Sequence, residues 1–91
     1  MAQDRFYLYD ETEETETRYV SFLGENERFD IGIVKTKRFF GKSLVFNIQS
    51  NRFAIIGTDD LDEPGYLESA FQLNEKEAEE LRTFLREAIF D

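Results

Sequence analysis

The sequence has 91 residues, 41% of them hydrophobic, and a formal net charge of -9, which suits one folded domain and is too short for two. It contains no Cys, so disulfides, thiolate nucleophiles and Cys-ligated metal centres are excluded. It also contains no His, which removes the commonest metal ligand and the usual general base near neutral pH. We therefore expect a single α+β domain over residues 1–91, with carboxylates, Lys, Tyr and hydroxyls as its only reactive groups.

The amino-terminal segment has neither the basic region nor the long apolar stretch of a secretory signal, because residues 6–9 are followed directly by acidic residues. No later stretch approaches the roughly 18 to 20 apolar residues that a membrane-spanning helix needs. We expect an acidic, cytoplasmic protein that has no membrane partner.

Hydrophobic residues alternate with polar ones through the first two-thirds of the chain, which is the pattern of half-buried strands. The alternating runs are Phe6/Leu8, Val20/Phe22, Phe29/Ile31/Ile33, Leu44/Phe46/Ile48 and Phe53/Ile55. Polar or Gly-containing segments at residues 24–28 and 37–41 have the length of hairpin turns. The pattern predicts an antiparallel meander of about five strands.

The last two runs also predict how they pair. A two-residue turn at residues 50–51 would place Ile48 opposite Phe53 on one face of the hairpin. The Ser-Asn pair lacks the Gly that most favours such a turn, so a longer loop is the alternative.

From Asn74 onward the hydrophobic period changes to between three and four, which indicates an amphipathic helix. Its apolar stripe consists of Ala78, Leu81, Phe84, Leu85, Ala88 and Ile89. Asn74 and Glu77 have the spacing of the N-cap and N3 residues of a capping box. We expect this C-terminal helix to pack on one face of the sheet, with Glu80 on the opposite side of the helix.

Two segments have less regular patterns. Residues 10–16 are dominated by acidic side chains, whose mutual repulsion predicts a solvated loop. Residues 58–73 contain a turn at residues 63–66, and residues 66–71 fit either a short helix or an edge strand. The pattern leaves these two alternatives open.

Several runs together resemble one protein family. They are Phe6-Tyr7-Leu8-Tyr9-Asp10-Glu11-Thr12-Glu13-Glu14, Gly24-Glu25-Asn26, Arg52-Phe53-Ala54-Ile55-Ile56-Gly57, Asp59-Asp60-Leu61 and Glu63-Pro64-Gly65-Tyr66-Leu67-Glu68. With these runs, nearly the whole chain resembles the small cytosolic proteins grouped as domain-of-unknown-function family 3055, from Bacillus-like Gram-positive bacteria. The resemblance implies a bacterial, cytosolic protein and brings no reaction, cofactor or active-site residues.

The run Gly41-Lys42-Ser43 copies the end of a phosphate-binding loop. The context does not fit, because Thr36 stands where the leading Gly belongs and a strand is predicted to follow instead of a helix. We interpret the run as a hairpin turn and expect no cofactor.

Four carboxylates lie within five positions, a clustering of oxygens that suits Ca²⁺ or Mg²⁺. They are Asp59, Asp60, Asp62 and Glu63. An EF-hand loop that started at Asp60 would have Pro64 and Phe71 where it needs two ligands. The two carboxylates of a glycosidase face each other across a cleft, which neighbours on one loop do not do. We assign no catalytic or metal site and keep these four residues as the metal candidates.

Basic and aromatic residues gather between the third and fourth predicted strands. The group consists of Lys35, Lys37, Arg38, Phe39, Phe40 and Lys42. Cations beside aromatic rings suit single-stranded nucleic acid, but the net charge of -9 opposes phosphate binding, so we expect no nucleic-acid partner. Phe39 and Phe40 cannot both face the core in a regular strand, so the outward one is a candidate anchor for a protein partner.

We expect a small, non-enzymatic protein-interaction module or a self-associating domain that binds through an exposed sheet edge or through this hairpin. The alternative is a carboxylate-based binder of a small ligand or divalent metal, or an enzyme that works without His or Cys. A flat, exposed apolar patch would favour the first class, and a deep pocket with converging polar groups would favour the second.

Overall fold

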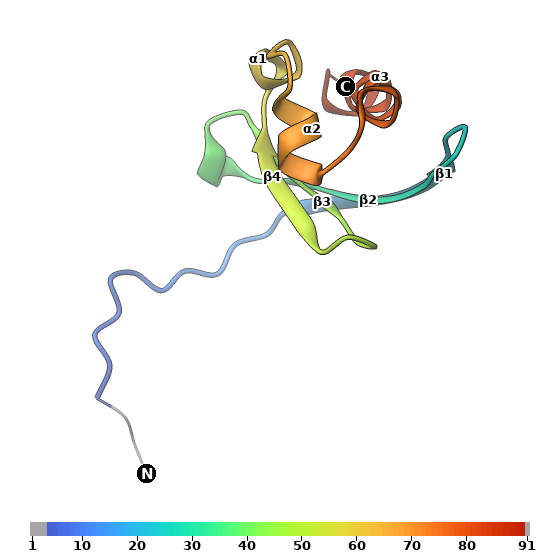
Figure 1. The fold of residues 1–91 in the computed structure, drawn as a ribbon. Coiled ribbons are helices and arrows are strands. Elements are labelled where there is room, and N and C mark those ends of the chain that lie inside the picture. Colours follow the sequence, from blue (N-terminus) through green and yellow to red (C-terminus); the bar gives the residue numbers. More distant parts are fainter. Residues whose placement is uncertain (1–3, 91) are drawn as a thin grey trace.

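Four antiparallel strands and three α-helices make up the fold in the computed structural model, which describes residues 4–90. Strand β1 spans Glu16–Leu23, β2 Arg28–Lys35, β3 Ser43–Asn47 and β4 Arg52–Ile56, in the sheet order β1-β2-β3-β4. A 3-10 turn, η1, spans Lys37–Phe39, and helices α1, α2 and α3 span Thr58–Leu61, Tyr66–Phe71 and Glu75–Phe90. Figure 1 shows the three α-helices on one side of the sheet. The predicted α+β class is confirmed.

The core lies between the helices and the face of the sheet that they cover. Phe29, Ile31 and Ile33 of β2 all point to this face, because alternate residues of a strand share a side. Leu81 and Leu85 of α3 are fully buried in the same cluster. Every residue of the predicted apolar stripe of α3 is buried or partly buried, so the predicted face of this helix is confirmed.

A reciprocal pair of hydrogen bonds fixes the start of α3. The Glu77 N–H donates to Asn74 Oδ1 at 2.8 Å, and the Asn74 N–H donates to Glu77 Oε1 at 3.0 Å, which confirms the predicted capping box. Glu80 differs from its prediction, because it is half-buried and its Oε2 accepts the Glu25 N–H at 2.7 Å. Glu80 therefore connects α3 to the turn between β1 and β2.

The predicted strand at Phe6 and Leu8 is wrong. Residues 4–15, which we call the arm, contain no strand, and Figure 1 shows the arm leaving the sheet at the start of β1. Alternation shows which side chains would share a face, but a strand also needs a hydrogen-bonded neighbour. In the structure, Tyr9 and Glu11 contact Arg38 of the turn at η1. No strand lies beside the arm in the sheet of the described chain. The described chain therefore has four strands and not five.

The predicted pairing at the β3–β4 turn is also wrong, and the longer loop is observed. Phe46 lies opposite Phe53 and Asn47 opposite Arg52, which leaves residues 48–51 as the loop. A two-residue type I′ turn needs positive φ at both central residues. In this loop only Asn51 has a positive φ, at 59°.

The segment between β4 and α3 forms two short helices. Residues 66–71 are helix α2 and not an edge strand, and Gly65 precedes them with a φ of 80°. Leu61 of α1 and Leu67 and Phe71 of α2 are buried, so both helices contribute to the core. None of the helices within the described chain is long and apolar enough to cross a membrane.

Candidate interaction surface

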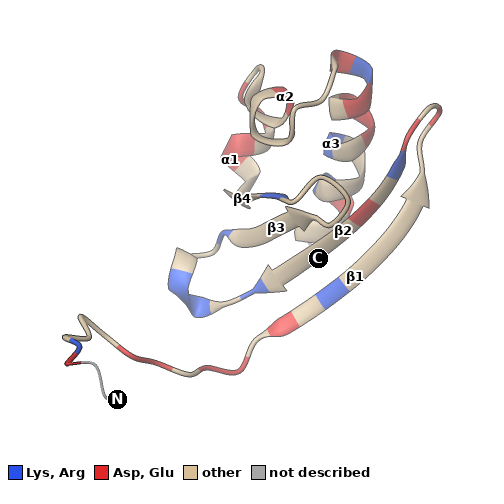
Figure 2. Ribbon diagram, turned by 60° about the horizontal axis from the view of Figure 1, so that its bottom comes forward, with Lys and Arg blue, Asp and Glu red and all other residues tan. Residues whose placement is uncertain are grey.

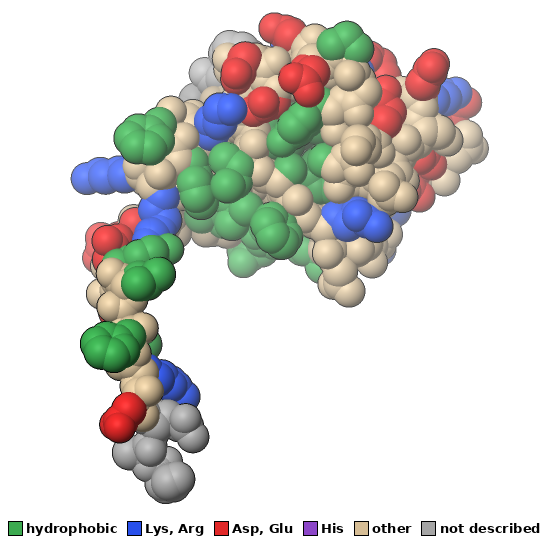
Figure 3. Space-filling model, turned by 60° about the vertical axis from the view of Figure 1, so that its left-hand side comes forward, with side chains coloured by type: hydrophobic (Ala, Val, Ile, Leu, Met, Phe, Trp, Pro, Cys, Tyr) green, Lys and Arg blue, Asp and Glu red, His purple; other side chains and the backbone are tan. Residues whose placement is uncertain are grey.

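The face of the sheet that carries no helix is apolar and exposed. The strand register places Tyr19, Gly32, Phe46 and Phe53 in one row across the sheet, and Thr17, Val34, Leu44 and Ile55 in the next. We call the six large apolar residues of these rows the open face: Tyr19, Val34, Leu44, Phe46, Phe53 and Ile55. Tyr19 is 70% exposed and Phe53 is 69% exposed. Figure 3 shows hydrophobic side chains gathered beside the arm.

Gly32 gives the open face its shape. A Cβ at this position would lie 2.3 Å from Cζ of Phe46, so only glycine leaves room for the Phe46 ring over β2. The ring also meets Tyr19 edge to face, with 6.3 Å between the ring centroids and 70° between the planes. The exposed aromatic residues are thus packed against one another and form an ordered surface.

The hairpin of residues 35–42 presents one outward Phe, as predicted. Phe40 is 97% exposed and Phe39 is half-buried. Phe40 also has a φ of 52°, a left-handed conformation that turns the chain back toward β3. Lys42 is not part of the same surface, because its ammonium group points to α1 and lies 3.0 Å from Asp60 Oδ2. The structure therefore separates the predicted basic group into two parts.

The acidic run meets the hairpin of its own chain. Arg38 Nη2 lies 3.3 Å from Glu11 Oε1, and its guanidinium carbon lies 5.1 Å from the centre of the Tyr9 ring. The Thr36 hydroxyl donates a hydrogen bond to Glu13. Figure 2 shows the acidic positions of the arm and the basic positions of the β2–β3 turn. Strand β3, which follows this turn, has no charged residue. The arm thus has defined contacts from residue 9 to residue 13.

Asp60 holds the start of α1. Its Oδ2 accepts the Gly57 N–H at 2.8 Å and the Lys42 ammonium at 3.0 Å, while Asp59 lies farther away, 3.9 Å from Lys42. Burial would raise the pKa of Asp60, but the hydrogen bonds from Gly57 and Lys42 outweigh it and keep that pKa below its usual range. The hydrogen bond between Lys42 and Asp60 also raises the pKa of Lys42.

The other two metal candidates point elsewhere. Asp62 Oδ1 lies 2.6 Å from Arg86 Nη2 of α3, and Glu63 is exposed in the turn before α2. Within residues 4–90, no three Asp or Glu side chains converge as metal ligands would. Asp60 therefore caps the start of α1, and Asp62 forms an ion pair that joins the end of α1 to α3.

Replacing Asp60 with Asn is expected to lower the free energy of unfolding at neutral pH by about 1–2 kcal/mol, because the helix cap loses its charged acceptor. The pKa of Asp60 is lower in the folded state than in the unfolded chain. Its contribution is therefore present above the unfolded pKa of about 3.9 and is lost as the pH falls through the folded pKa. Urea melts of both proteins should converge toward low pH. A difference that stays constant with pH, or an equal loss in Glu63→Gln, would contradict this role.

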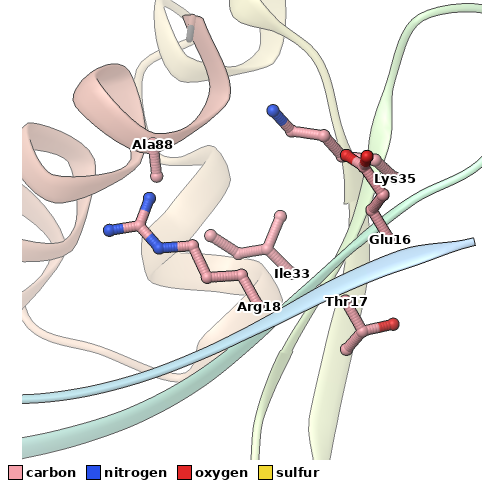
Figure 4. A pocket seen from close by; sticks show the side chains of 6 residues that line it. All are labelled: Glu16, Thr17, Arg18, Ile33, Lys35 and Ala88. Carbon is pink, nitrogen blue, oxygen red and sulfur yellow. The ribbon is translucent and has the colours of Figure 1, made fainter.

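A small pocket lies between β1, β2 and the end of α3. Its volume is about 280 Å³, and it is lined by Glu16, Thr17, Arg18, Ile33, Lys35 and Ala88. In Figure 4 the Arg18 side chain points toward α3 and the Thr17 side chain points away from it. Ligand pockets usually measure about 300–1,000 Å³ and hold several converging polar groups. A larger hollow of about 500 Å³, lined in part by Asp62, Arg82 and Arg86, is more open to solvent. Neither supports a small-ligand function as strongly as the open face supports a protein contact.

Comparison with known proteins relates this chain to a family. The model of the SAV0927-like family matches residues 8–87, which include the open face, the hairpin and the four candidate carboxylates. No curated protein matches the chain at a significant level. The predicted resemblance to an uncharacterised family of small proteins is confirmed at this level.

Proposed function

We propose that this chain, which belongs to the SAV0927-like family, is a non-enzymatic module that binds another protein through its open face. An antiparallel sheet that is covered on one side usually turns polar residues to water on the other. Here Tyr19, Phe53 and Ile55 are exposed on that side. This exposed apolar face is the observation that carries the proposal.

The size of the open face supports a functional contact. Four strands about 4.8 Å apart and five residues of about 3.3 Å each give a flat area of roughly 300 Å². The largest apolar patch on a monomer typically reaches about 300–600 Å² and often has a function. The sheet also has no charged residue in the two rows that form the open face, so a partner can cover them without burying a charge.

The hairpin of residues 35–42 is a second candidate contact within the same function. Phe40 offers an exposed aromatic ring, and Lys37 and Arg38 lie beside it in the sequence. An aromatic anchor with adjacent cations suits an acidic protein partner. We place this activity in the bacterial cytosol, as the resemblance of the sequence implies.

Replacing both Phe53 and Tyr19 with Ser is expected to abolish the binding of whichever protein the wild-type chain captures from a bacterial cytosolic extract. The reason is that the exposed rings supply most of the apolar area of the contact. Circular dichroism and urea melts should show a folded domain, because both side chains are largely exposed. Binding should then be measured by titration with the purified partner.

The matched control is Phe40→Ser, which removes an exposed ring from the hairpin and not from the sheet. This variant should keep the partner if the open face carries the interaction. Capture that the double variant retains and Phe40→Ser loses would assign the contact to the hairpin. Capture that neither change affects would refute a role for both surfaces.

A further inference from the structure

We infer that residues 6–9 of the arm bind the open face of a second copy of this chain, so that two copies exchange arms and form a reciprocal dimer. The inference rests on the proposed function, because it names an occupant for the open face. It joins two apolar surfaces that no other part of the described chain covers. An exposed apolar surface of this size is unusual on a single domain. Because both surfaces are apolar, each can bind the other.

The first surface is the arm itself. Residues 6–9 are four consecutive apolar residues, and Phe6 is 101% exposed and Leu8 96% exposed. In an extended segment, Phe6 and Leu8 share one side and Tyr7 and Tyr9 share the other. The two purely apolar side chains can therefore face a sheet while the tyrosine hydroxyls stay in water.

The second surface is the open face, whose composition matches the arm. Phe6 and Leu8 need apolar and aromatic neighbours, which Phe46, Phe53 and Ile55 supply. The arm carries acidic residues on both sides of its apolar segment, and the open face adds no carboxylate that would repel them. Arg28 and Asp30, which lie on the same side of the sheet beyond the row of Tyr19, are 3.2 Å apart and pair with each other.

The contacts of the arm direct its apolar segment away from its own sheet. Arg38 holds Glu11 at 3.3 Å and Tyr9 at 5.1 Å, at the end of the sheet where Glu16 pairs with Lys35. Residues 4–8 continue outward from there, as Figures 1 and 2 show. The radius of gyration is 15.4 Å, compared with about 12 Å for a compact domain of this length. To reach its own open face, the arm would have to reverse direction and give up the contacts with Arg38. The arm can bind the open face of a second copy without reversing direction and while it keeps the contacts with Arg38.

The area of an exchanged pair is sufficient for a stable dimer. Phe6 and Leu8 face the sheet, and the open face measures roughly 300 Å², so one arm can bury roughly 300 Å² and cover a similar area of the face that receives it. Two reciprocal contacts then bury roughly 1,200 Å², which reaches the range of about 1,200–2,000 Å² that stable interfaces bury. A single arm on a single face would bury only half of this area, which favours the reciprocal arrangement.

The test uses the full chain and two double variants whose substitutions lie at exposed positions. The arm variant is Phe6→Ser with Leu8→Ser, and the face variant is Phe53→Ser with Ile55→Ser. Sedimentation and light scattering over a range of concentrations should show that the wild type dimerises and that each variant has a dissociation constant at least about tenfold higher. The control Phe40→Ser should dimerise as the wild type does. Circular dichroism verifies that all the variants are folded.

Mixing the two variants identifies the contact. The arm variant keeps an intact face and the face variant keeps an intact arm, so together they can form one arm–face contact. Sedimentation at high micromolar concentration should therefore show that the mixture associates more tightly than either variant alone, although more weakly than the wild type. This result would support the exchange of arms, and it would exclude the packing of two open faces against each other.

Three outcomes would overturn the inference. A wild type that is monomeric at high micromolar concentration has no arm exchange, and an arm variant that dimerises as the wild type does has an interface elsewhere. A mixture that associates no more tightly than either variant alone also excludes an arm–face contact between copies. The proposed function would survive each of these outcomes if the Tyr19 and Phe53 substitutions still abolished the capture of a different protein.

Discussion

Replacing Leu85 with Ala is expected to lower the free energy of unfolding by about 2–5 kcal/mol. Leu85 is fully buried at the centre of the apolar stripe of α3, in the same cluster as Ile33 and Val45. The smaller side chain would lose its transfer free energy and would leave a cavity between the helix and the sheet. A domain of this size has about 5–15 kcal/mol of stability in total, so the loss should be evident in a urea melt.

Glu87→Ala is the matched control for this change, because Glu87 is exposed on the same helix. It should change the stability by less than about 0.5 kcal/mol. Glu80 would be a poor control, since its carboxylate accepts the Glu25 N–H at 2.7 Å and its removal would leave that N–H without this acceptor. Similar losses in Leu85→Ala and Glu87→Ala would show that the packed face of α3 is assigned wrongly.

The sequence predicts the parts of this fold in which local pattern and burial agree. The period of α3 and its Asn74–Glu77 capping box are both local features, and both are confirmed. Four strands also coincide with predicted alternating runs. The arm shows the limit of this reasoning, because Phe6 and Leu8 have the alternation of a strand but no neighbouring strand to bond with.

The sequence pattern does not predict the open face, because alternation separates the two sides of a strand but does not show which side the helices cover. In β3, the polar Ser43 and Asn47 are buried under the helices, at 4% and 5% exposure, while Leu44 and Phe46 lie on the side without helices. A strand with apolar residues on one side and buried polar residues on the other looks ordinary in sequence. Only the position of the helices reveals that its apolar side lacks a cover.

The hairpin illustrates how composition predicts a group of residues but not their partners. One outward Phe was predicted and Phe40 is that residue, at 97% exposure. The sequence does not show what these cations contact, whereas in the structure Arg38 contacts Glu11 of its own chain. Contacts over 27 positions depend on the path of the chain, which local patterns do not contain.

Arg82 is another residue whose role the sequence does not reveal, because it resembles any solvated cation on a helix. Its side chain is only 15% exposed. Its Nε donates to the carbonyl oxygen of Leu61 at 3.0 Å, and its two terminal nitrogens lie 3.6 Å from Glu68 and 2.5 Å from Glu79. Arg82 therefore joins all three helices of the described chain at one point, and its Nη2 forms the ion pair with the buried Glu68 Oε1.

Replacing Arg82 with Ala is expected to lower the free energy of unfolding by about 2–4 kcal/mol. It leaves the Glu68 carboxylate without its ion-pair partner, and the Leu61 carbonyl oxygen keeps only its longer, 3.5 Å hydrogen bond from Arg86. Arg82→Lys should recover only part of this loss, since an ammonium group cannot serve three acceptors in the planar geometry of a guanidinium. Urea melts of both variants measure the difference.

A second substitution separates the charge effect from the loss of packing. Glu68→Gln removes the buried negative charge, so adding it to Arg82→Ala should cost less than it costs in the wild type. If the two losses simply add, Glu68 does not depend on Arg82, and the stabilisation comes from the contacts of the Arg82 side chain with α1 instead. A fall in stability that is no larger than that of Glu87→Ala would show that Arg82 behaves as a surface cation and that the three helices are held together by their apolar contacts alone.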